Sequence, residues 1–182
     1  WYPLAKKKIY LNYKKNSIST EENIIKTFKE KFDSAVKKRL IADVEVGSLL
    51  SGGLDSSAIV GTMKKFQEKV KTFTIGYKET PNDNEFNHAR KIAEIFKTDH
   101  HEIIISEKDA INYMEKLVYD QDEPIADNVC VPLNFISKYV KSKDIKVLLV
   151  GEGADEQFCG YYHYFKSLKH SNLLRNFNRF SP

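Results

Sequence analysis

The sequence predicts an α/β fold in which a parallel, twisted sheet carries helices on both of its faces. Short apolar segments rich in β-branched residues alternate with longer segments of helical period, which is the order typical of parallel sheets. The segment 145–150 is continuously apolar, as expected of a strand covered on both faces. Two glycine-rich loops follow directly after predicted strands, where ligands bind in such sheets.

The individual elements are predicted from the spacing of apolar residues and from the capping and turn residues between them. Ser19 and Glu22 have the spacing of a capping box, with Ser19 as the N-cap, and apolar residues recur at helical spacing from Ile24 to Leu40. We expect this first helix to be scaffold. The later expected elements are strand 44–50, helix 56–67, strand 70–77, polar loop 78–84, helix 85–96, strand 101–105, helix 107–119, acidic loop 120–127, helix 131–141 and strand 145–150.

Size and composition fit one soluble domain. The chain has 182 residues, of which 41% are hydrophobic and 30% charged. Its net charge of +4 comes from short basic clusters mixed with acidic residues, which indicates a solvated surface and no nucleic-acid partner. No segment approaches the roughly 18 apolar residues of a membrane span, and no signal pattern is present, so we expect a cytoplasmic protein. The start at Trp1 indicates a cut in a longer polypeptide or an engineered boundary.

The two cysteines have no metal-ligand spacing. Cys130 and Cys159 are predicted to be free thiols in a reducing compartment. His100 and His101 are neighbours on a predicted strand, whose side chains point to opposite faces. We therefore expect structural roles for these two histidines, and no metal site.

The loop after the first strand has the chemistry of a phosphate cradle. Gly52 and Gly53 let backbone N–H groups approach an anion, and the N-terminus of the next helix adds a partial positive charge. Hydroxyl donors come from Ser51, Ser56 and Ser57. The Lys of the mononucleotide P-loop is missing, and Asp55 lies in the loop instead. A carboxylate beside phosphates requires a divalent cation, so Asp55 is a candidate Mg²⁺ ligand.

A second loop after the last predicted strand is rich in carboxylates. Glu152, Asp155 and Glu156 fall within six residues, together with Gly151 and Gly153. A solvated acidic turn or the first turn of a helix would also explain this pattern. Paired with the first loop, it predicts that each loop supplies a carboxylate to one metal bound to a polyphosphate. A third acidic segment, Asp120 to Asp127, is equally well explained as a surface loop.

Taken together, these segments resemble the synthetase domain of the glutamine-dependent asparagine synthetase family, a branch of the PP-loop ATP pyrophosphatases (adenine nucleotide alpha hydrolase-like). The matching motifs occur in the family's order and cover essentially the whole chain. They are 40–44 running into 49–57, then 73–77, 98–102, 122–124, 151–156 and 160–161. The resemblance implies a carbon–nitrogen ligase that activates aspartate as a β-aspartyl-AMP, releases pyrophosphate and lets ammonia displace AMP. The cofactors it implies are ATP and Mg²⁺.

The resemblance also assigns roles to matching positions. The pyrophosphate portion of ATP would be held by Ser51, Gly52, Gly53, Asp55, Ser56 and Ser57. The nucleoside would be contacted by Leu49, Ile75 and Gly151. Asp55 and Asp155 would bind Mg²⁺, while Glu152 would face the reacting carboxylate and accept a proton from ammonia. Asp55, Asp155 and Glu152 are thus the expected catalytic residues.

The chain departs from the family pattern at two positions and matches only part of it. Val150 replaces a frequent Ser, and Cys159 replaces a Gly, so the acceptor carboxylate stays open. Residues 1–18 are expected to link to a glutaminase domain that precedes them and delivers ammonia. Residues 19–182 would be the N-terminal part of the synthetase domain, inactive without the remainder. The sequence does not reveal the oligomeric state, and a homodimer of the full-length enzyme stays open.

Three alternatives to an asparagine-forming enzyme share parts of this pattern. An amidotransferase of the same family could act on another carboxylate in a biosynthetic pathway. A PP-loop tRNA-modifying enzyme is disfavoured, because the chain shows neither paired cysteines nor a strong basic surface. A non-catalytic nucleotide-binding domain is disfavoured because Asp55, Glu152 and Asp155 are all retained.

Overall fold

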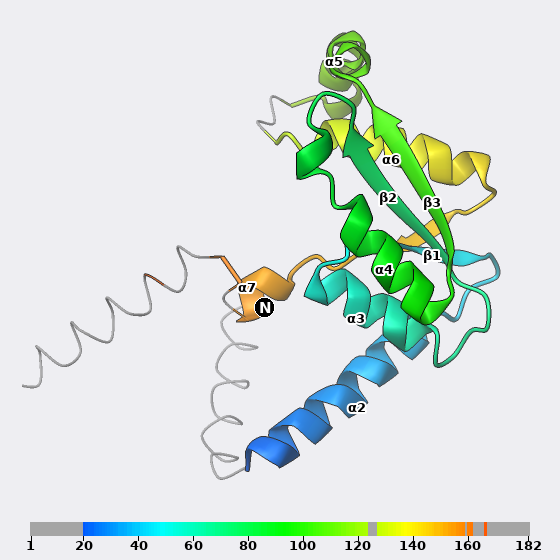
Figure 1. Cartoon of the computed structure of the whole chain (residues 1–182), viewed down its shortest axis with the longest axis vertical. Helices are drawn as coiled ribbons and strands as arrows, with labels where there is room; N and C mark the ends of the chain where they lie inside the picture. Colours follow the sequence, from blue (N-terminus) through cyan, green and yellow to red (C-terminus); the bar gives the residue numbers. More distant parts are fainter. Residues whose placement is uncertain (1–19, 124–126, 159, 162–165, 167–182) are drawn as a thin grey trace, which may run out of the picture. The chain divides into compact units, whose positions relative to one another are not determined.

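A computed structural model describes residues 20–123, 127–158, 160–161 and 166 of the chain (Figure 1). The predicted linker 1–18, the expected cap Ser19 and Cys159 lie outside the described residues. The chain divides into two compact units, residues 1–41 and 42–182, and each is described by itself. Among the described residues, none of the helices is both long enough and apolar enough to cross a membrane.

The first unit contains the helix α2 (Glu21–Arg39). Its N-cap is Thr20, whose side chain accepts a hydrogen bond from the backbone N–H of Asn23 at 3.4 Å, so the predicted cap at Ser19 is wrong by one residue. Acidic residues in the first turn and basic residues in the last complement the helix dipole. Only part of the expected apolar face is covered: Val36 is buried, whereas Ile24, Ile25 and Phe28 are exposed.

The second unit contains a four-stranded sheet with the strand order β3-β2-β1-β4. Its strands are β1 (Val46–Leu49), β2 (Lys71–Tyr77), β3 (Asp99–Ile105) and β4 (Val147–Leu149). All three pairings are parallel, with Ser48 opposite both Thr72 and Leu149, and Phe73 opposite His101. The predicted parallel sheet is therefore confirmed.

Helices connect the strands and lie over both faces of the sheet (Figure 1). Their bounds are α3 (Leu54–Met63), the short 3₁₀ helix η1 (Pro81–Asp83), α4 (Phe86–Phe96), α5 (Glu107–Gln121), α6 (Cys130–Ser142) and α7 (Ala154–Phe158). Every predicted helix is present, with ends shifted by a few residues. The expected acidic loop 120–127 is wrong at its start, because Asp120 and Gln121 belong to α5.

Two hydrophobic clusters, one on each face, hold the helices on the sheet. On one face, Leu50 packs with Val60 of α3 and with Ala89 and Ala93 of α4. On the other face, Phe73 packs with Ile136 and Val140 of α6 and with Ile145. Burial of these side chains stabilises the fold by about 25 cal/mol per Å² of apolar surface. This burial is the main contribution that holds the helices and the strand ends in place.

The strand β4 differs from the prediction. It is shorter than the expected strand 145–150, and it pairs only with β1 among the described strands. Val147 is 37% exposed and Val150 is 41% exposed, so this apolar segment is not covered on both faces as its composition suggested. A continuous apolar run cannot distinguish a central strand from a sheet edge, because both contain the same residue types.

Candidate functional site

The first glycine-rich loop lies between β1 and α3, as the sequence predicted. Leu50 still pairs with the sheet, because its N–H donates to the carbonyl of Phe73 at 2.9 Å. Gly53 is the N-cap of α3 and no side chain caps this helix, so amides of its first turn remain available to an anion. α3 is the helix that follows β1 in Figure 1.

Gly52 shapes the loop through its backbone and its lack of a side chain. Its φ of +82° lies in the left-handed region that residues with a Cβ rarely adopt. A Cβ at this position would lie 2.5 Å from the Cβ of His88 and 2.7 Å from the backbone N of Ala89. The loop therefore packs directly on the first turns of α4, and glycine is required here for two separate reasons.

Serine side chains hold the loop in shape. The Ser51 and Ser56 hydroxyl oxygens are 2.9 Å apart, and the N–H of Ser51 donates to Ser56 Oγ at 3.2 Å. The N–H of Gly53 donates to Ser51 Oγ at 3.1 Å. Ser57 Oγ is buried and has no hydrogen-bond partner among the described residues. A buried hydroxyl without a partner is costly, so a ligand oxygen here would satisfy it.

The second glycine-rich loop follows β4. Gly153 has a φ of +85°, and α7 begins at the next residue. Glu152 is exposed, and Asp155 is half-buried in the first turn of α7. Tyr161 donates to Glu156 at 3.0 Å, and this hydrogen bond raises the pKa of Tyr161.

The two loops meet at Gly151. A Cβ on Gly151 would lie 3.1 Å from the Cβ of Asp55 and 3.4 Å from the backbone N of Ser56. The start of the carboxylate-rich loop therefore contacts the first loop at Asp55, the residue that gives the first loop its carboxylate. Strand register explains this meeting, because β1 and β4 are parallel neighbours and end at the same edge.

The residues present fit a magnesium ion that is shared with phosphates. Within the part of the chain that the structure describes, no group of three or more His, Cys, Asp or Glu side chains could enclose a metal. Mg²⁺ is ordinarily held by one or two carboxylates together with substrate phosphates and water. Asp55 and Asp155 could supply those carboxylates.

The remaining predicted site residues lie at the same edge of the sheet. Leu49 is the last residue of β1, and Ile75 lies near the carboxyl end of β2. Both are partly buried and pack against the cluster that contains Phe73. That Leu49 and Ile75 contact a nucleoside stays a prediction.

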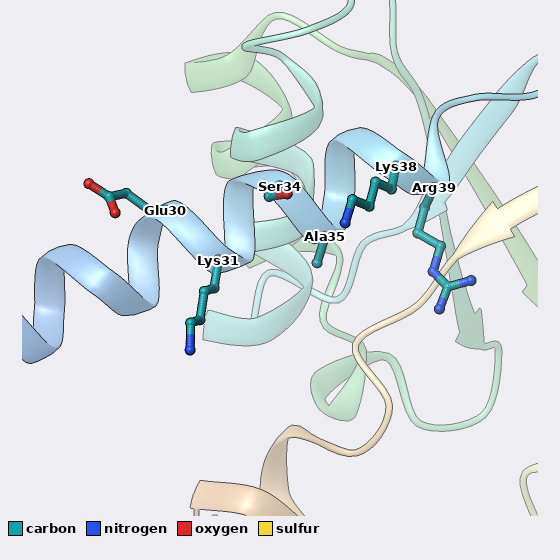
Figure 2. A pocket seen from close by; sticks show the side chains of 6 residues that line it. All are labelled: Glu30, Lys31, Ser34, Ala35, Lys38 and Arg39. Carbon is teal, nitrogen blue, oxygen red and sulfur yellow. The ribbon is translucent and has the colours of Figure 1, made fainter. Parts of the chain in front are cut away.

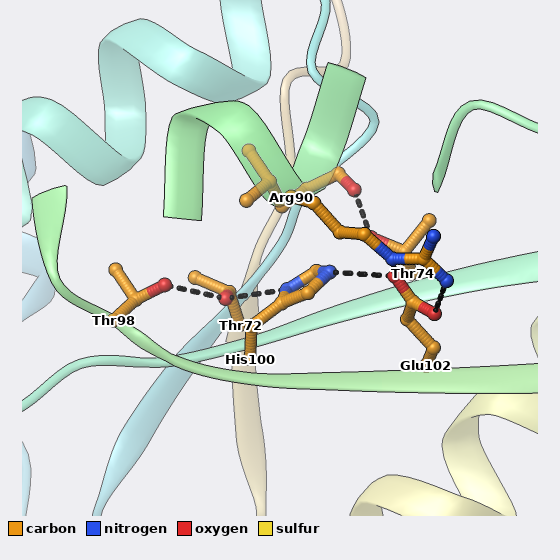
Figure 3. Close-up of polar contacts among 7 residues, drawn as sticks. Thr72, Thr74, Arg90, Thr98, His100 and Glu102 are labelled. Carbon is orange, nitrogen blue, oxygen red and sulfur yellow. Dashed lines mark hydrogen bonds and ion pairs between the residues drawn. The ribbon is translucent and has the colours of Figure 1, made fainter. Parts of the chain in front are cut away.

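A polar network between the sheet and α4 was not predicted from the sequence (Figure 3). Glu102 of β3 accepts two hydrogen bonds from Arg90 of α4, at 2.8 and 2.6 Å. His100 lies two residues from Glu102 on the same strand face, and its Nδ1 is 2.9 Å from Thr72 Oγ1. The expected structural role of His100 and His101 is consistent with this geometry, since His101 stacks on Phe73 on the opposite face. The spacing of His100 and Glu102 could have indicated this network, since residues i and i+2 of a strand lie on the same face.

Some described features are not part of the predicted site. A hollow of about 620 Å³ on α2 is lined by Glu30, Lys31, Ser34, Ala35, Lys38 and Arg39, none of which is a predicted site residue (Figure 2). In the acidic segment, Asp120 pairs with Lys116, and Asp127 accepts a hydrogen bond from the N–H of Val129 at 3.0 Å. These contacts are structural. Cys130 is a free thiol at the start of α6.

Comparisons with known proteins relate the chain to a family. The family model described as Asparagine synthase matches residues 27–180. The glutamine-hydrolyzing asparagine synthetase 1 of Bacillus subtilis (strain 168) is 36% identical over 162 residues, which are 88% of this chain and 25% of that protein. The glutamine-hydrolyzing asparagine synthetase of Bos taurus is 36% identical over 145 residues, 75% of this chain and 25% of that protein. The chain thus spans about a quarter of the length of these relatives.

One solved structure supports the fold. NMN synthetase from Francisella tularensis has a TM-score of 0.50 and 16% sequence identity, and the match covers 75% of this chain and 58% of that chain. At this level of identity the likeness supports the fold and nothing finer.

Proposed function

The chain belongs to the asparagine synthase family, and from that premise we propose that it forms the ATP-binding part of a ligase that amidates a carboxylate. In the proposed reaction, a carboxylate oxygen attacks the α-phosphorus of ATP, the bond to the β-phosphate breaks and pyrophosphate leaves. Ammonia then attacks the acyl carbon, and the bond to AMP breaks. Aspartate is the proposed acceptor, with asparagine as the product.

The observation that carries this proposal is the contact between the two loops at Gly151 and Asp55. A phosphate-type loop alone would suit many nucleotide-binding proteins. Here a second, carboxylate-rich loop touches it on the side of Asp55. Polyphosphate and carboxylates can share such a place only with a cation between them, which favours chemistry on ATP with Mg²⁺.

Roles follow for the residues of the first loop. Free amides at the start of α3, together with the hydroxyls of Ser51, Ser56 and Ser57, would bind the pyrophosphate oxygens. Fixed N–H dipoles stabilise the charge that grows on pyrophosphate as it leaves. Mg²⁺ held by Asp55 and Asp155 would neutralise the same charge when it is bound. Leu49, Ile75 and Gly151 would border the nucleoside.

Glu152 is the proposed base of the second half-reaction. It is exposed and follows Gly151 directly, so it lies next to the contact with the first loop. Ammonia must lose protons as the amide forms, and a carboxylate within reach of the nitrogen would accept one. We propose that the ammonia comes from glutamine, because the two curated relatives are named as glutamine-hydrolyzing. A cytoplasmic location is part of this proposal.

The experiment uses the natural polypeptide that contains this chain, with ATP, Mg²⁺ and ammonia. Pyrophosphate release is measured with aspartate and with a panel of other carboxylates. We expect release that depends on aspartate and that Asp55→Asn lowers about 100-fold or more, because a charge-stabilising contact is lost. Asp43→Asn is the matched control, since Asp43 is exposed and precedes the amino end of β1.

Each result is decisive. Formation of ADP and phosphate in place of AMP and pyrophosphate would refute adenylation. Release that depends on a different acid would refute the aspartate assignment and keep the chemistry, as the Val150 and Cys159 departures allow. Normal activity in Asp55→Asn would remove the metal-ligand role.

A further inference from the structure

The helix α4 is the support on which the phosphate-type loop rests. The nearest atoms to a Cβ placed on Gly52 are the Cβ and carbonyl carbon of His88 and the backbone N of Ala89. Ala89 is fully buried in the cluster with Leu50 and Val60. Any shift of the first turns of α4 therefore changes the space in which the Gly52 backbone lies.

Arg90 follows this contact directly and attaches α4 to the sheet. Its Nε donates to Glu102 Oε1 at 2.8 Å and its Nη2 donates to Glu102 Oε2 at 2.6 Å (Figure 3). This two-pronged arrangement fixes both position and orientation, since the guanidinium is planar and its donors have a fixed geometry. Hydrogen bonding to Glu102 raises the pKa of Arg90.

Glu102 lies beside His100 on the strand β3. His100 Nε2 is 3.5 Å from Glu102 Oε1, and Thr72 bonds both His100 and Thr98 at 2.9 Å (Figure 3). Burial lowers the pKa of His100, so this imidazole is neutral at neutral pH and Arg90 is the cation that pairs with Glu102. On the same sheet face, Thr74 donates to the carbonyl of Leu50, the residue just before the loop.

From this arrangement we propose that Arg90 and Glu102 are positioning residues for pyrophosphate. By fixing α4 against β3, the pair holds the backbone of His88 and Ala89 on which Gly52 rests, and so sets the fit of the loop to the polyphosphate of ATP. This inference rests on the proposed function, because it concerns the same loop. Neither residue needs to touch the ligand.

The exposure of the pair separates this role from a general structural one. The Arg90 side chain is 54% exposed and that of Glu102 is 22% exposed. Ion pairs this close to solvent contribute little to global stability. A small displacement of a binding group can nevertheless lower binding or catalysis strongly. We therefore expect large effects on the binding of polyphosphate and small effects on the free energy of unfolding.

The test measures direct binding and steady-state kinetics in the natural polypeptide. The variants are Arg90→Gln, Glu102→Gln, their double variant and Arg90→Lys. Mg²⁺-pyrophosphate and adenosine are titrated separately by calorimetry, and kcat/KM is measured for ATP and for the carboxylate. The matched control is Lys71→Gln, which removes an ion pair of Lys71 with Glu45 at 2.9 Å, at the amino end of β2.

We expect each single variant to weaken pyrophosphate binding about tenfold and to leave adenosine binding unchanged. The double variant should bind no more weakly than the worse single variant, because the two residues act as one unit. Arg90→Lys should bind pyrophosphate more weakly than the wild type and more tightly than Arg90→Gln, since an ammonium group cannot form the two-pronged contact. Lys71→Gln should match the wild type, and the loss in kcat/KM should concern ATP and not the carboxylate.

Three outcomes would overturn the inference: wild-type pyrophosphate affinity in Glu102→Gln, equal losses for pyrophosphate and adenosine, or additive effects in the double variant. Binding is measured without turnover, so the outcome is separable from the proposed reaction. If the wild type adenylates no carboxylate but Glu102→Gln still weakens pyrophosphate binding, the proposed function fails and the positioning role stands. If the wild type binds no pyrophosphate, both fail.

Discussion

The loop Ser51–Ser57 is supported from several sides, whereas the loop 151–156 has few supports among the described residues. The first loop has four hydrogen bonds that involve Ser51 or Ser56, and it rests on α4. In the second, a Cβ on Gly153 would meet nothing within 4 Å, and no residue of α7 is buried. We therefore expect substitutions in the first loop to cost more stability than matched substitutions in the second.

Replacement of Gly52 by Ala is the strongest way to test this contrast. The left-handed backbone would cost about 1–2 kcal/mol, and the new Cβ would collide with the backbone of α4, so we expect a total loss of about 3 kcal/mol or more. Urea unfolding measures the stability, and pyrophosphate titration measures the site. A stability loss below about 1 kcal/mol would show that the loop is not pressed on α4.

Ser56→Ala removes the hydroxyl that bonds Ser51 and Gly53. Ser56 is 9% exposed, so the N–H of Ser51 loses a largely buried partner, and we expect a cost of about 1–2 kcal/mol. Hydrogen exchange at the Ser51 amide should become faster. Ser34→Ala on the exposed surface of α2 is the control and should change neither quantity.

Gly153→Ala is the matched test in the second loop. Gly153 has nearly the same φ as Gly52, +85° against +82°, but it has open space around it. We therefore expect only the backbone cost, about 1 kcal/mol. Equal losses of stability in Gly52→Ala and Gly153→Ala, compared by urea unfolding, would refute the proposed difference between the loops.

The smallest expected effect concerns Tyr161 and Glu156. Their hydrogen bond raises the pKa of Tyr161, so the folded state keeps this proton longer than the unfolded state as pH rises. The contact should be fully present below about pH 10 and lost above it. An ultraviolet titration of wild type minus Tyr161→Phe should show a tyrosine that ionises late, and Glu156→Ala should reduce the delay. An ordinary pKa in the wild type would contradict the contact.

Much of the fold was predictable because its signals are local. Alternating strand and helix periods indicated the parallel sheet, and the glycines after strands indicated where the two loops would meet. The helix start at Thr20 was missed because Ser and Thr are both favoured cap residues, and the backbone conformation decides between neighbours. The position of β4 at the end of the strand order was not predicted, because amino-acid composition does not determine strand order.

The candidate site was predictable in its loops and not in its support. Asp55 and Gly151 occur in recognisable motifs, so their meeting could be anticipated. Arg90 is one of 29 basic residues and has no motif that marks it. Its bond to Glu102 depends on how α4 packs across β2 and β3, which is a property of the folded chain.

The strand register also bears on the order in which the site forms during folding. Ser48 pairs with Thr72 across 24 residues, whereas it pairs with Leu149 across 101 residues. Closing the longer segment costs more chain entropy, and contacts far apart in sequence form late. The unit formed by β1, α3 and β2 around the first loop is therefore expected to assemble before β4 pairs with β1. A chain still emerging from the ribosome would acquire its anion-binding loop before the carboxylates that complete it.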